Sequence, residues 1–254
     1  MSRQTSLKLR VLRSQTRQLF NALSKLPSMA NFILIGGTAL ALQIAHRVSN
    51  DLDFAVFNER LPFKEIDGLV SALQMRKQKV QLITSHEKIT AFKINTGENL
   101  LNYVRDYAID GVKVTFFAHG KTPKQREFFK RASVVRPRGC FFGVLGVDGL
   151  KVAKTLVLGD RVRSRDIYDL MVLVRDHGYC ISEILHNAQT LGINNDPEYY
   201  KAVMTGKIPL DKEDEGLEAV GVKVVMPEIY AFFRKAVSEC EIEISTQFFR
   251  SQIK

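Results

Sequence analysis

The chain has 254 residues, of which 45% are apolar and 25% are charged, and this balance is that of a globular protein rather than a disordered one. No apolar run is long enough to span a bilayer, and no signal-peptide core follows the basic first ten residues. The three cysteines are far apart and form no Cys-x-x-Cys pair, which argues against a disulfide framework and a zinc ribbon. We therefore expect a cytoplasmic protein with reduced thiols and no membrane partner.

The net charge of +10 favours polyanionic partners, because basic side chains that neutralise phosphates release the counterions bound there. A basic surface that serves only solubility would carry the same charge. Charge alone therefore leaves nucleic-acid binding open, and the motifs must decide it.

Helices and strands are predicted in mixed order along the N-terminal half, from the spacing of apolar residues and the turn residues between them. We expect helices over 7–26, 38–45 and 63–75, and strands over 32–35, 51–57, 80–83, 89–94, 101–109 and 112–117. A basic segment, residues 124–138, follows and contains Phe128 and Phe129. This aromatic pair could stack on nucleic-acid bases, although adjacent phenylalanines more often belong to a core.

Beyond Gly146 the apolar spacing is helical almost throughout. We expect helices over 147–158, 164–175, 183–191, 198–204 and 227–249, with a polar loop containing a short strand or hairpin over 206–225. The sequence thus predicts an α/β domain over residues 1–135, with a mixed sheet flanked by helices. A mainly helical domain is predicted over residues 136–254.

Two glycines and a hydroxyl residue, Gly36, Gly37 and Thr38, come directly after an apolar strand and before a short helix. Glycine lets the backbone approach a phosphate without interference from a Cβ, and the N–H groups of a helix N-terminus bind anions. The Thr38 hydroxyl could donate to a phosphate oxygen or cap the helix. A Gly-Gly pair is also a common plain turn, so this motif needs support from elsewhere in the chain.

That support comes from Asp51 and Asp53, which lie at alternate positions of the next predicted strand and therefore project to the same face. Two carboxylates this close repel each other unless a cation lies between them. Mg²⁺ prefers such oxygen ligands and completes its shell with phosphates and water. An Asp-x-Asp pair can also be a solvated strand edge, but the glycine turn and the carboxylates together predict a metal and nucleotide site.

The segment from Gly36 to Phe54 resembles the signature of the AbiEii/AbiGii toxin family of nucleotidyltransferases, which belong to the DNA polymerase β-like superfamily. The shared elements are Gly-Gly-Thr-Ala-Leu at 36–40, His-Arg-x-Ser at 46–49 and Asp-Leu-Asp-Phe at 51–54. The resemblance implies that Asp51 and Asp53 hold Mg²⁺ or Mn²⁺, and it makes Arg47 and Ser49 candidates for positioning the nucleotide. Arg47 could instead be a cation that stabilises a helix C-terminus.

A second block, in the predicted helical half, extends the resemblance. The family's Lys, Arg, Arg-Asp and Asp correspond to Lys154, Arg161, Arg165-Asp166 and, with altered spacing, Asp169. Lys154 would contact the triphosphate or neutralise transition-state charge, with Lys151 as a nearby alternative. Asp166 is the expected catalytic or orienting carboxylate and Asp169 its structural partner. Without the resemblance, these residues would be interpreted as a surface salt-bridge network.

Many polymerase β-like enzymes place a third carboxylate on a later strand, and this chain departs from that pattern. The central position of the best candidate strand is Thr115, and Asp110 precedes that strand at a turn. Either Asp110 serves as the base, or the activity lacks a strong base, or the chain binds without turnover.

The resemblance implies an enzyme that transfers a nucleotidyl group from an NTP to RNA, with tRNA as the acceptor of some relatives. It also implies a toxin-antitoxin or phage-defence role with a separate antitoxin protein as partner. Two alternatives stay open. The acceptor could be a protein or small-molecule hydroxyl, or the protein could bind nucleotide or nucleic acid without catalysis.

Overall fold

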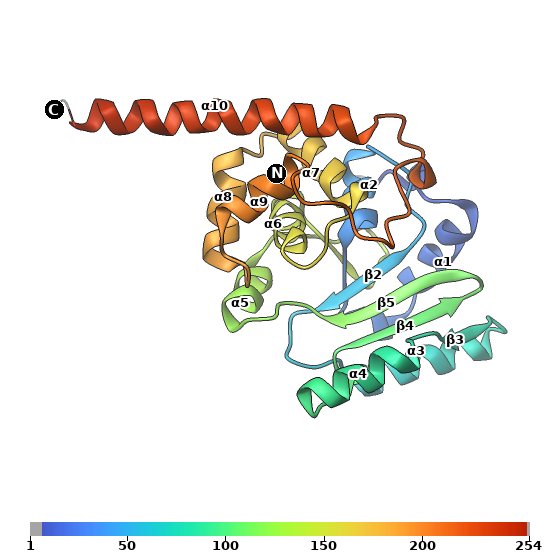
Figure 1. The fold of residues 1–254 in the computed structure, drawn as a ribbon. Coiled ribbons are helices and arrows are strands. Elements are labelled where there is room, and N and C mark those ends of the chain that lie inside the picture. Colours follow the sequence, from blue (N-terminus) through green and yellow to red (C-terminus); the bar gives the residue numbers. More distant parts are fainter. Residues whose placement is uncertain (1–6, 253–254) are drawn as a thin grey trace. The chain divides into compact units, whose positions relative to one another are not determined.

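The computed structural model describes residues 7–252, so the first six residues of the basic N-terminus lie outside the described residues. The chain forms two compact units, the first ending at Leu150 and the second beginning at Lys151 (Figure 1). β7, at residues 143–145, belongs to the sheet of the first unit although it lies beyond residue 135, where the sequence places the domain boundary.

Within residues 7–252, one seven-stranded mixed sheet forms the centre of the first unit, in the order β3-β4-β5-β2-β1-β7-β6. Its strands are β1 Ile33–Ile35, β2 Leu52–Val56, β3 Val80–Leu82, β4 Val104–Ile109, β5 Val112–Ala118, β6 Val134–Val135 and β7 Gly143–Leu145. β2 pairs in parallel with β5, and β1 with β7, while the other neighbours are antiparallel. The predicted mixed sheet is therefore confirmed, and Figure 1 shows β2, β5 and β4 side by side.

Aromatic side chains dominate the core beside the central strands. Phe54 of β2 stacks on Phe116 of β5 with ring centroids 5.6 Å apart, and its other neighbour, Phe142, meets it edge to face at 4.9 Å. All three rings are fully buried. Because strand side chains alternate, the packing of Leu52 and Phe54 into this core turns Asp51 and Asp53 to the opposite face of the sheet.

Several helices of the first unit contact the sheet through their apolar sides. α2 contacts β1 and β2, α1 contacts β5, and α3 contacts β3. The helices of this unit, with the two 3₁₀ turns that flank α1, are η1 Leu9–Val11, α1 Ser14–Ser24, η2 Pro27–Met29, α2 Gly36–Ile44, α3 Phe63–Met75, α4 His86–Thr96 and α5 Pro123–Arg131. α3 matches its predicted range in full.

The predicted strand over 89–94 is wrong, because these residues lie inside helix α4. Ser85 caps α4 by accepting a hydrogen bond from the Lys88 N–H, and Gly97 ends the helix with a positive φ of 75°. No residue of α4 is buried. Its sequence therefore lacks the 3.6-residue apolar period that distinguishes a helix from a strand.

Two other predicted elements are interrupted by local contacts. The helix expected over 7–26 breaks after η1, where the Val11 carbonyl accepts a hydrogen bond from Ser49 N–H, and α1 starts at Ser14. The strand expected over 101–109 starts at Val104, after a 3₁₀ turn, η3, over Leu100–Asn102.

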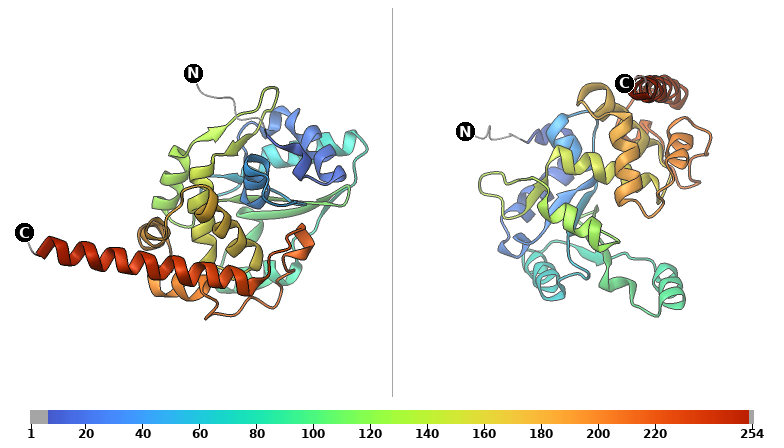
Figure 2. Two further views of the ribbon diagram at one scale, coloured as in Figure 1. Left: turned by 90° about the horizontal axis from the view of Figure 1, so that it is seen from above. Right: turned by 90° about the vertical axis from the view of Figure 1, so that its left-hand side faces the viewer.

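The second unit is helical, as predicted, and its longest helix packs on the three helices before it. α10 Met226–Gln252 contacts α7 Ser164–Asp176, α8 Ile181–Leu191 and α9 Pro197–Met204. α6 Val147–Leu158 begins in the first unit and continues into the second. Both views in Figure 2 show α10 beside α8. Ile229 and Phe233 anchor α10 in a core with Ile167, Leu170 and Tyr200, all fully buried.

Residues 206–225 contain turns and a 3₁₀ segment, η4 Glu218–Val220, rather than the expected strand or hairpin. Among the helices of residues 7–252, none combines the length and apolar character needed to cross a membrane.

Candidate functional site

The glycine turn and Asp53 meet at the start of α2. Gly36 has a positive φ of 73°, which bends the chain sharply between β1 and α2. β1 and β2 are antiparallel, with Ile35 opposite Asp53, so the turn lies next to the acidic strand. A Cβ built on Gly36 would be 3.0 Å from the Asp53 carboxylate oxygen Oδ2. Both the backbone angle and the close approach therefore require glycine at this position.

Replacing Gly36 by Ala should destabilise the turn by about 1–2 kcal/mol from the positive φ alone, in addition to the crowding against Asp53. Gly68, exposed in α3 with no atom within 4 Å of a built Cβ, is the matched control. Gly68→Ala should stabilise the protein by about 0.5–1 kcal/mol, because alanine favours a helix interior. Urea unfolding of both variants measures the difference, and equal stabilities would contradict this account of Gly36.

Thr38 links the glycine turn to the segment before β2 through hydrogen bonds of its side chain. Its hydroxyl donates to the Asp51 carbonyl oxygen and lies 2.6 Å from the Ser49 hydroxyl. Thr38 and Ser49 are both buried, at 1% and 5% exposure. The helix N-cap position is Ile35, so Thr38 lies inside the first turn of α2. These hydroxyls therefore hold the glycine turn and the Asp51 backbone together.

The Arg47 side chain reaches back to the same turn. A Cβ on Gly37 would overlap the Arg47 guanidinium, with Cζ only 3.1 Å away, so this side chain occupies the space that glycine leaves. Arg47 also donates to the Val48 carbonyl at 3.1 Å. A guanidinium beside the N-terminus of α2 adds a full positive charge to the partial charge of the helix end, and together they suit a phosphate.

The acidic pair is accessible as well as close to the turn. Asp51 and Asp53 are both partly exposed. Within residues 7–252 no group of three or more His, Cys, Asp or Glu side chains could hold a metal ion by itself. Two carboxylates without a third protein ligand are the usual donor set for Mg²⁺ that shares its shell with substrate phosphates.

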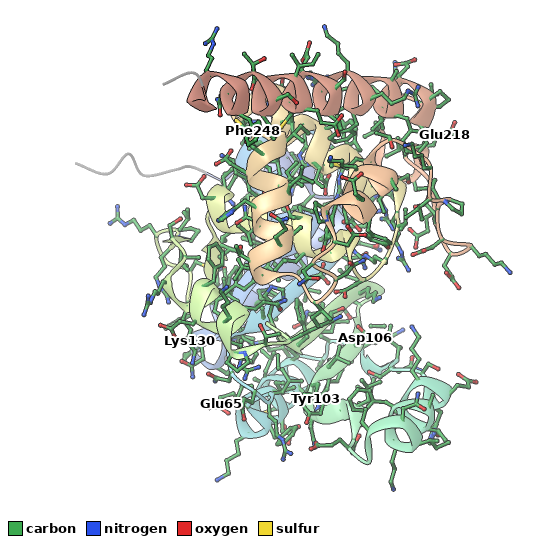
Figure 3. The ribbon with its side chains drawn as sticks, turned by 60° about the vertical axis from the view of Figure 1, so that its left-hand side comes forward. Glu65, Tyr103, Asp106, Lys130, Glu218 and Phe248 are labelled. Atoms are coloured by element: carbon green, nitrogen blue, oxygen red, sulfur yellow. The ribbon has the colours of Figure 1, made fainter. Side chains whose placement is uncertain are left out.

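A third carboxylate, Asp106, lies in the same row of the sheet, and the sequence reasoning missed it. Thr115 of β5 is directly opposite Asp53 on one side and Asp106 of β4 on the other. Opposite residues in neighbouring strands project to the same face. The Thr115 hydroxyl donates to Asp106 Oδ1 at 2.7 Å. Asp106 is labelled in Figure 3 and is half-buried.

Asp110, the other candidate for a third carboxylate, lies at the turn between β4 and β5 with a positive φ of 47°. Its carboxylate accepts hydrogen bonds from the Lys79 N–H at 2.9 Å and from the Gln78 side chain at 3.1 Å. Asp110 thus closes the hairpin, four residues beyond Asp106, rather than joining the row with Asp53.

The second unit contains a buried cluster of charges on α6 and α7. Lys154 Nζ lies 2.7 Å from Asp166 Oδ1 and 2.6 Å from Asp169 Oδ2, and Arg161 Nε lies 2.9 Å from Asp166 Oδ2. Lys154, Asp166 and Asp169 are at most 5% exposed. The two carboxylates share Lys154 as the sequence predicts, but the network is buried rather than on the surface.

The cations of this cluster lower the pKa of Asp166. Burial opposes the ionised form of Asp166, but the cations Lys154 and Arg161 outweigh it and hold the pKa of Asp166 below its usual range. Arg161, whose side chain is 45% exposed, is the part of the cluster that a substrate can reach most directly.

The basic segment forms α5 and the following strand. Phe129 is fully buried and packs against His119 and Phe57, with ring centroids 4.4 Å and 5.6 Å away. Phe129 is therefore a core residue, while Phe128 is half-buried. The exposed side chains of this segment include Lys124, Lys130, Arg131, Arg136 and Arg138.

Comparison with known proteins identifies the family of this chain. The family model described as "Nucleotidyl transferase AbiEii toxin, Type IV TA system" matches residues 17–193. An uncharacterized protein of Aquifex aeolicus (strain VF5) is 25% identical over 182 residues, which cover 69% of this chain and 73% of that protein.

A solved structure from Helicobacter pylori shows the same fold. JHP933 from Helicobacter pylori has a TM-score of 0.50 and 15% identity, covering 96% of this chain and 100% of that one. MenT4, a nucleotidyltransferase toxin from Mycobacterium tuberculosis H37Rv, has a TM-score of 0.47 and 13% identity, with coverage of 88% and 84%.

Proposed function

This chain belongs to the family of AbiEii nucleotidyl transferase toxins and is a nucleotidyltransferase, and we propose that it transfers a nucleotidyl group from an NTP to RNA. The observation that carries the proposal is the contact between the Gly36 turn and the Asp53 carboxylate. A phosphate-binding turn and a metal-binding carboxylate must converge on one triphosphate for this reaction, and here they lie within one contact distance.

Each residue around the turn has a distinct part in nucleotide binding. The N–H groups at the start of α2, freed of Cβ atoms at Gly36 and Gly37, bind the phosphates. Arg47 adds a guanidinium next to them. Thr38 and Ser49 are buried, so their part is to fix the turn relative to Asp51. None of these residues is assigned a contact with the nucleobase, so the choice of NTP would depend on residues outside the turn.

Asp51 and Asp53 would hold Mg²⁺ or Mn²⁺, to which their hard oxygen donors and partial exposure are suited. A bound divalent ion would neutralise charge that develops on the phosphates. Without a cation, the two carboxylates would repel the triphosphate, so the residues themselves favour binding of nucleotide together with metal.

Asp106 is suited to the acceptor rather than to the nucleotide. One oxygen of Asp106 accepts a hydrogen bond from the Thr115 hydroxyl. Thr115 belongs to β5, the strand that lies between Asp106 and Asp53 in the sheet. Adjacent strands are about 4.8 Å apart, so Asp106 lies about 10 Å from Asp53 along the sheet, too far to share one ion with it. We assign it the orientation, or deprotonation, of the attacking hydroxyl.

Asp106→Asn should lower turnover by about 10²-fold, the usual contribution of a positioned acid or base. Its matched control is Asp67→Asn. Asp67 is an exposed carboxylate of α3 that pairs at 3.0 Å with Arg105, the neighbour of Asp106 in β4. Asp67→Asn should stay within about twofold of the parent rate, as exposed ion pairs contribute little. A single-turnover assay compares them, and equal rates would remove Asp106 from the reaction.

Lys154 and Asp166 are proposed to serve the same reaction. Transition-state charge in phosphoryl transfer is stabilised by fixed cations, and the cluster holds Lys154 and Arg161 in fixed positions against Asp166. Because Arg161 is the most exposed cation of the cluster, it is the expected contact to the triphosphate. Asp166, itself paired with Lys154, orients it.

RNA is the proposed acceptor because the chain carries a net charge of +10 and exposes basic side chains along α5 and residues 131–138. Some members of the resembled family modify tRNA, which makes tRNA the first acceptor to test. Such a reaction would take place in the cytoplasm, and the family's type IV toxin-antitoxin description supports a separate antitoxin protein.

Incubation with total RNA, Mg²⁺ and each NTP in turn tests the proposal, with label in either the α- or the γ-phosphate. Nucleotidyl transfer carries the α-label into RNA and releases the γ-label with pyrophosphate. Label in protein or in a small molecule alone would support the alternative acceptors. Nucleotide binding without any labelled product would support binding without turnover, and transfer of the γ-label would overturn the reaction class.

A further inference from the structure

An acidic strap, defined here as residues 211–215, holds the segment of the second unit that carries Asp166. The strap lies about 50 residues beyond that segment in the sequence, between α9 and α10. It contacts Val162 in the connection from α6 to α7, and Ser164 and Arg165 in the first turn of α7. Arg161 and Asp166, which bind each other, flank these contacts on either side.

The first contact fixes the backbone next to Arg161. The Val162 N–H donates to Asp211 Oδ2 at 3.1 Å, and the Asp211 N–H donates back to the Val162 carbonyl at 2.9 Å. These two hydrogen bonds satisfy both backbone groups of Val162, and they hold Val162, the residue after Arg161, against the strap.

The second contact supplies the missing cap of α7. Arg163 occupies the N-cap position and makes no side-chain cap hydrogen bond. Asp214 Oδ1 accepts instead from the Ser164 N–H at 3.0 Å and from the Ser164 hydroxyl at 2.9 Å. A carboxylate at this position satisfies an N–H that the helix leaves unpaired and interacts favourably with the helix dipole. Asp166 is only two residues further along, in the same first turn.

The third contact is weaker. Arg165 Nη2 lies 2.9 Å from Glu215 Oε2, but the Glu215 side chain is 64% exposed. Ion pairs of this kind add little to stability. Asp214, with two hydrogen bonds to one residue, is therefore the part of the strap that fixes the first turn of α7.

We propose that Asp214 is a positioning residue of the transferase: it holds the first turn of α7 so that Asp166 stays aligned with Lys154 and Arg161. This inference rests on the proposed role of the cluster in nucleotidyl transfer. The proposal predicts that the geometry of the cluster depends on Asp214. Asp214 would act through Ser164 and not by contact with the substrate, Lys154, Arg161 or Asp166.

Three variants separate capping from charge. Asp214→Ala removes both hydrogen bonds, whereas Asp214→Asn keeps an acceptor oxygen but loses the charge, and asparagine is a good cap residue. Ser164→Ala removes only the hydroxyl and leaves the N–H to Asp214. Glu213→Gln is the control, because Glu213 is an exposed acid of the strap that precedes Asp214 in the sequence.

Two readouts are needed, kcat and KM for the NTP, and hydrogen exchange of the backbone amides of residues 164–166. Asp214→Ala should lower kcat about tenfold with KM within about twofold, and should speed exchange about tenfold, as loss of a cap typically does. Asp214→Asn should restore most of both values, Ser164→Ala should lie between, and Glu213→Gln should match the parent chain.

Unchanged kcat in Asp214→Ala would overturn the proposal, as would reduced kcat with unchanged exchange. Equal damage in Asp214→Asn and Asp214→Ala would also overturn it, since charge rather than capping would then be responsible. Should Asp214→Ala fail to fold, Ser164→Ala and Asp214→Asn carry the comparison. A parent chain without transferase activity would contradict the proposed function, while the exchange data would still report on the cap.

Discussion

Asp53→Asn is expected to abolish nucleotidyl transfer, with a loss of at least about 10²–10³-fold, while the chain stays folded. Asparagine has nearly the volume of aspartate, so the contact with Gly36 survives, but the negative charge that would hold a divalent ion is lost. Asp51→Asn should have an effect of the same kind, because Asp51 lies two residues before Asp53 and is proposed to bind the same ion. Single-turnover transfer of α-labelled NTP to RNA measures the loss, and circular dichroism checks the fold.

The matched comparison is Asp110→Asn, which changes the same functional group at the β4–β5 turn. Asparagine tolerates the positive φ of 47° found there, and it can still accept from the Lys79 N–H. Its activity should remain within about twofold of the parent, because loss of an exposed turn carboxylate costs little. If Asp53→Asn retained activity while Asp110→Asn lost it, the site assigned to Asp51 and Asp53 would be wrong.

The glycine turn and the acidic strand could be placed from the sequence because both depend on local rules. A strand, a Gly-Gly pair, a short helix and an alternating acidic strand leave few ways to connect, and the antiparallel pairing of β1 with β2 brings Gly36 and Asp53 together. The helices of the second unit were predictable for the same reason, since their apolar spacing is regular.

Asp106 and Asp214 could not be found in this way, because their roles come from pairing between distant segments. Asp106 enters the row of Asp53 only through the registers of β5 with β2 and of β4 with β5. Asp214 contacts Ser164 from 50 residues away, and it lies in the polar segment 206–225, for which the sequence predicts a loop with a short strand or hairpin. The register of a sheet and the path of a loop depend on tertiary packing, which local spacing does not encode.

The burial of the Lys154 cluster was the least predictable feature of the site, and it makes Lys154 the residue with the largest expected effect on stability. Charged residues three apart on a helix are usually solvated, yet Asp169 is fully buried and Asp166 nearly so. Regular apolar spacing indicates which face of α7 is buried, but it does not indicate that ionised groups share that face. A buried ion pair is costly to break, since the remaining charge has no partner.

Lys154→Met should therefore destabilise the protein by about 3–5 kcal/mol at neutral pH, the usual cost of leaving a buried charge uncompensated. It should also reduce transfer, because Asp166, which pairs with Arg161, loses its ion pair with Lys154. Lys151→Met is the control: Lys151 is half-buried, with its ammonium 5.7 Å from the centre of the Tyr179 ring. Loss of that contact should cost about 1 kcal/mol or less.

The pH dependence of this difference identifies its cause. In the parent chain the pKa of Asp166 is held below its usual range, so its ionisation contributes stability above about pH 4, which is lost as the pH falls through the folded-state pKa. In Lys154→Met the balance reverses, because burial then raises the pKa of Asp166 and protonation relieves the cost. The stability gap between the two proteins should therefore be widest near pH 7 and narrow towards pH 4, as measured by urea unfolding. A gap that is constant with pH would show that Lys154 stabilises the core through packing and not through its charge.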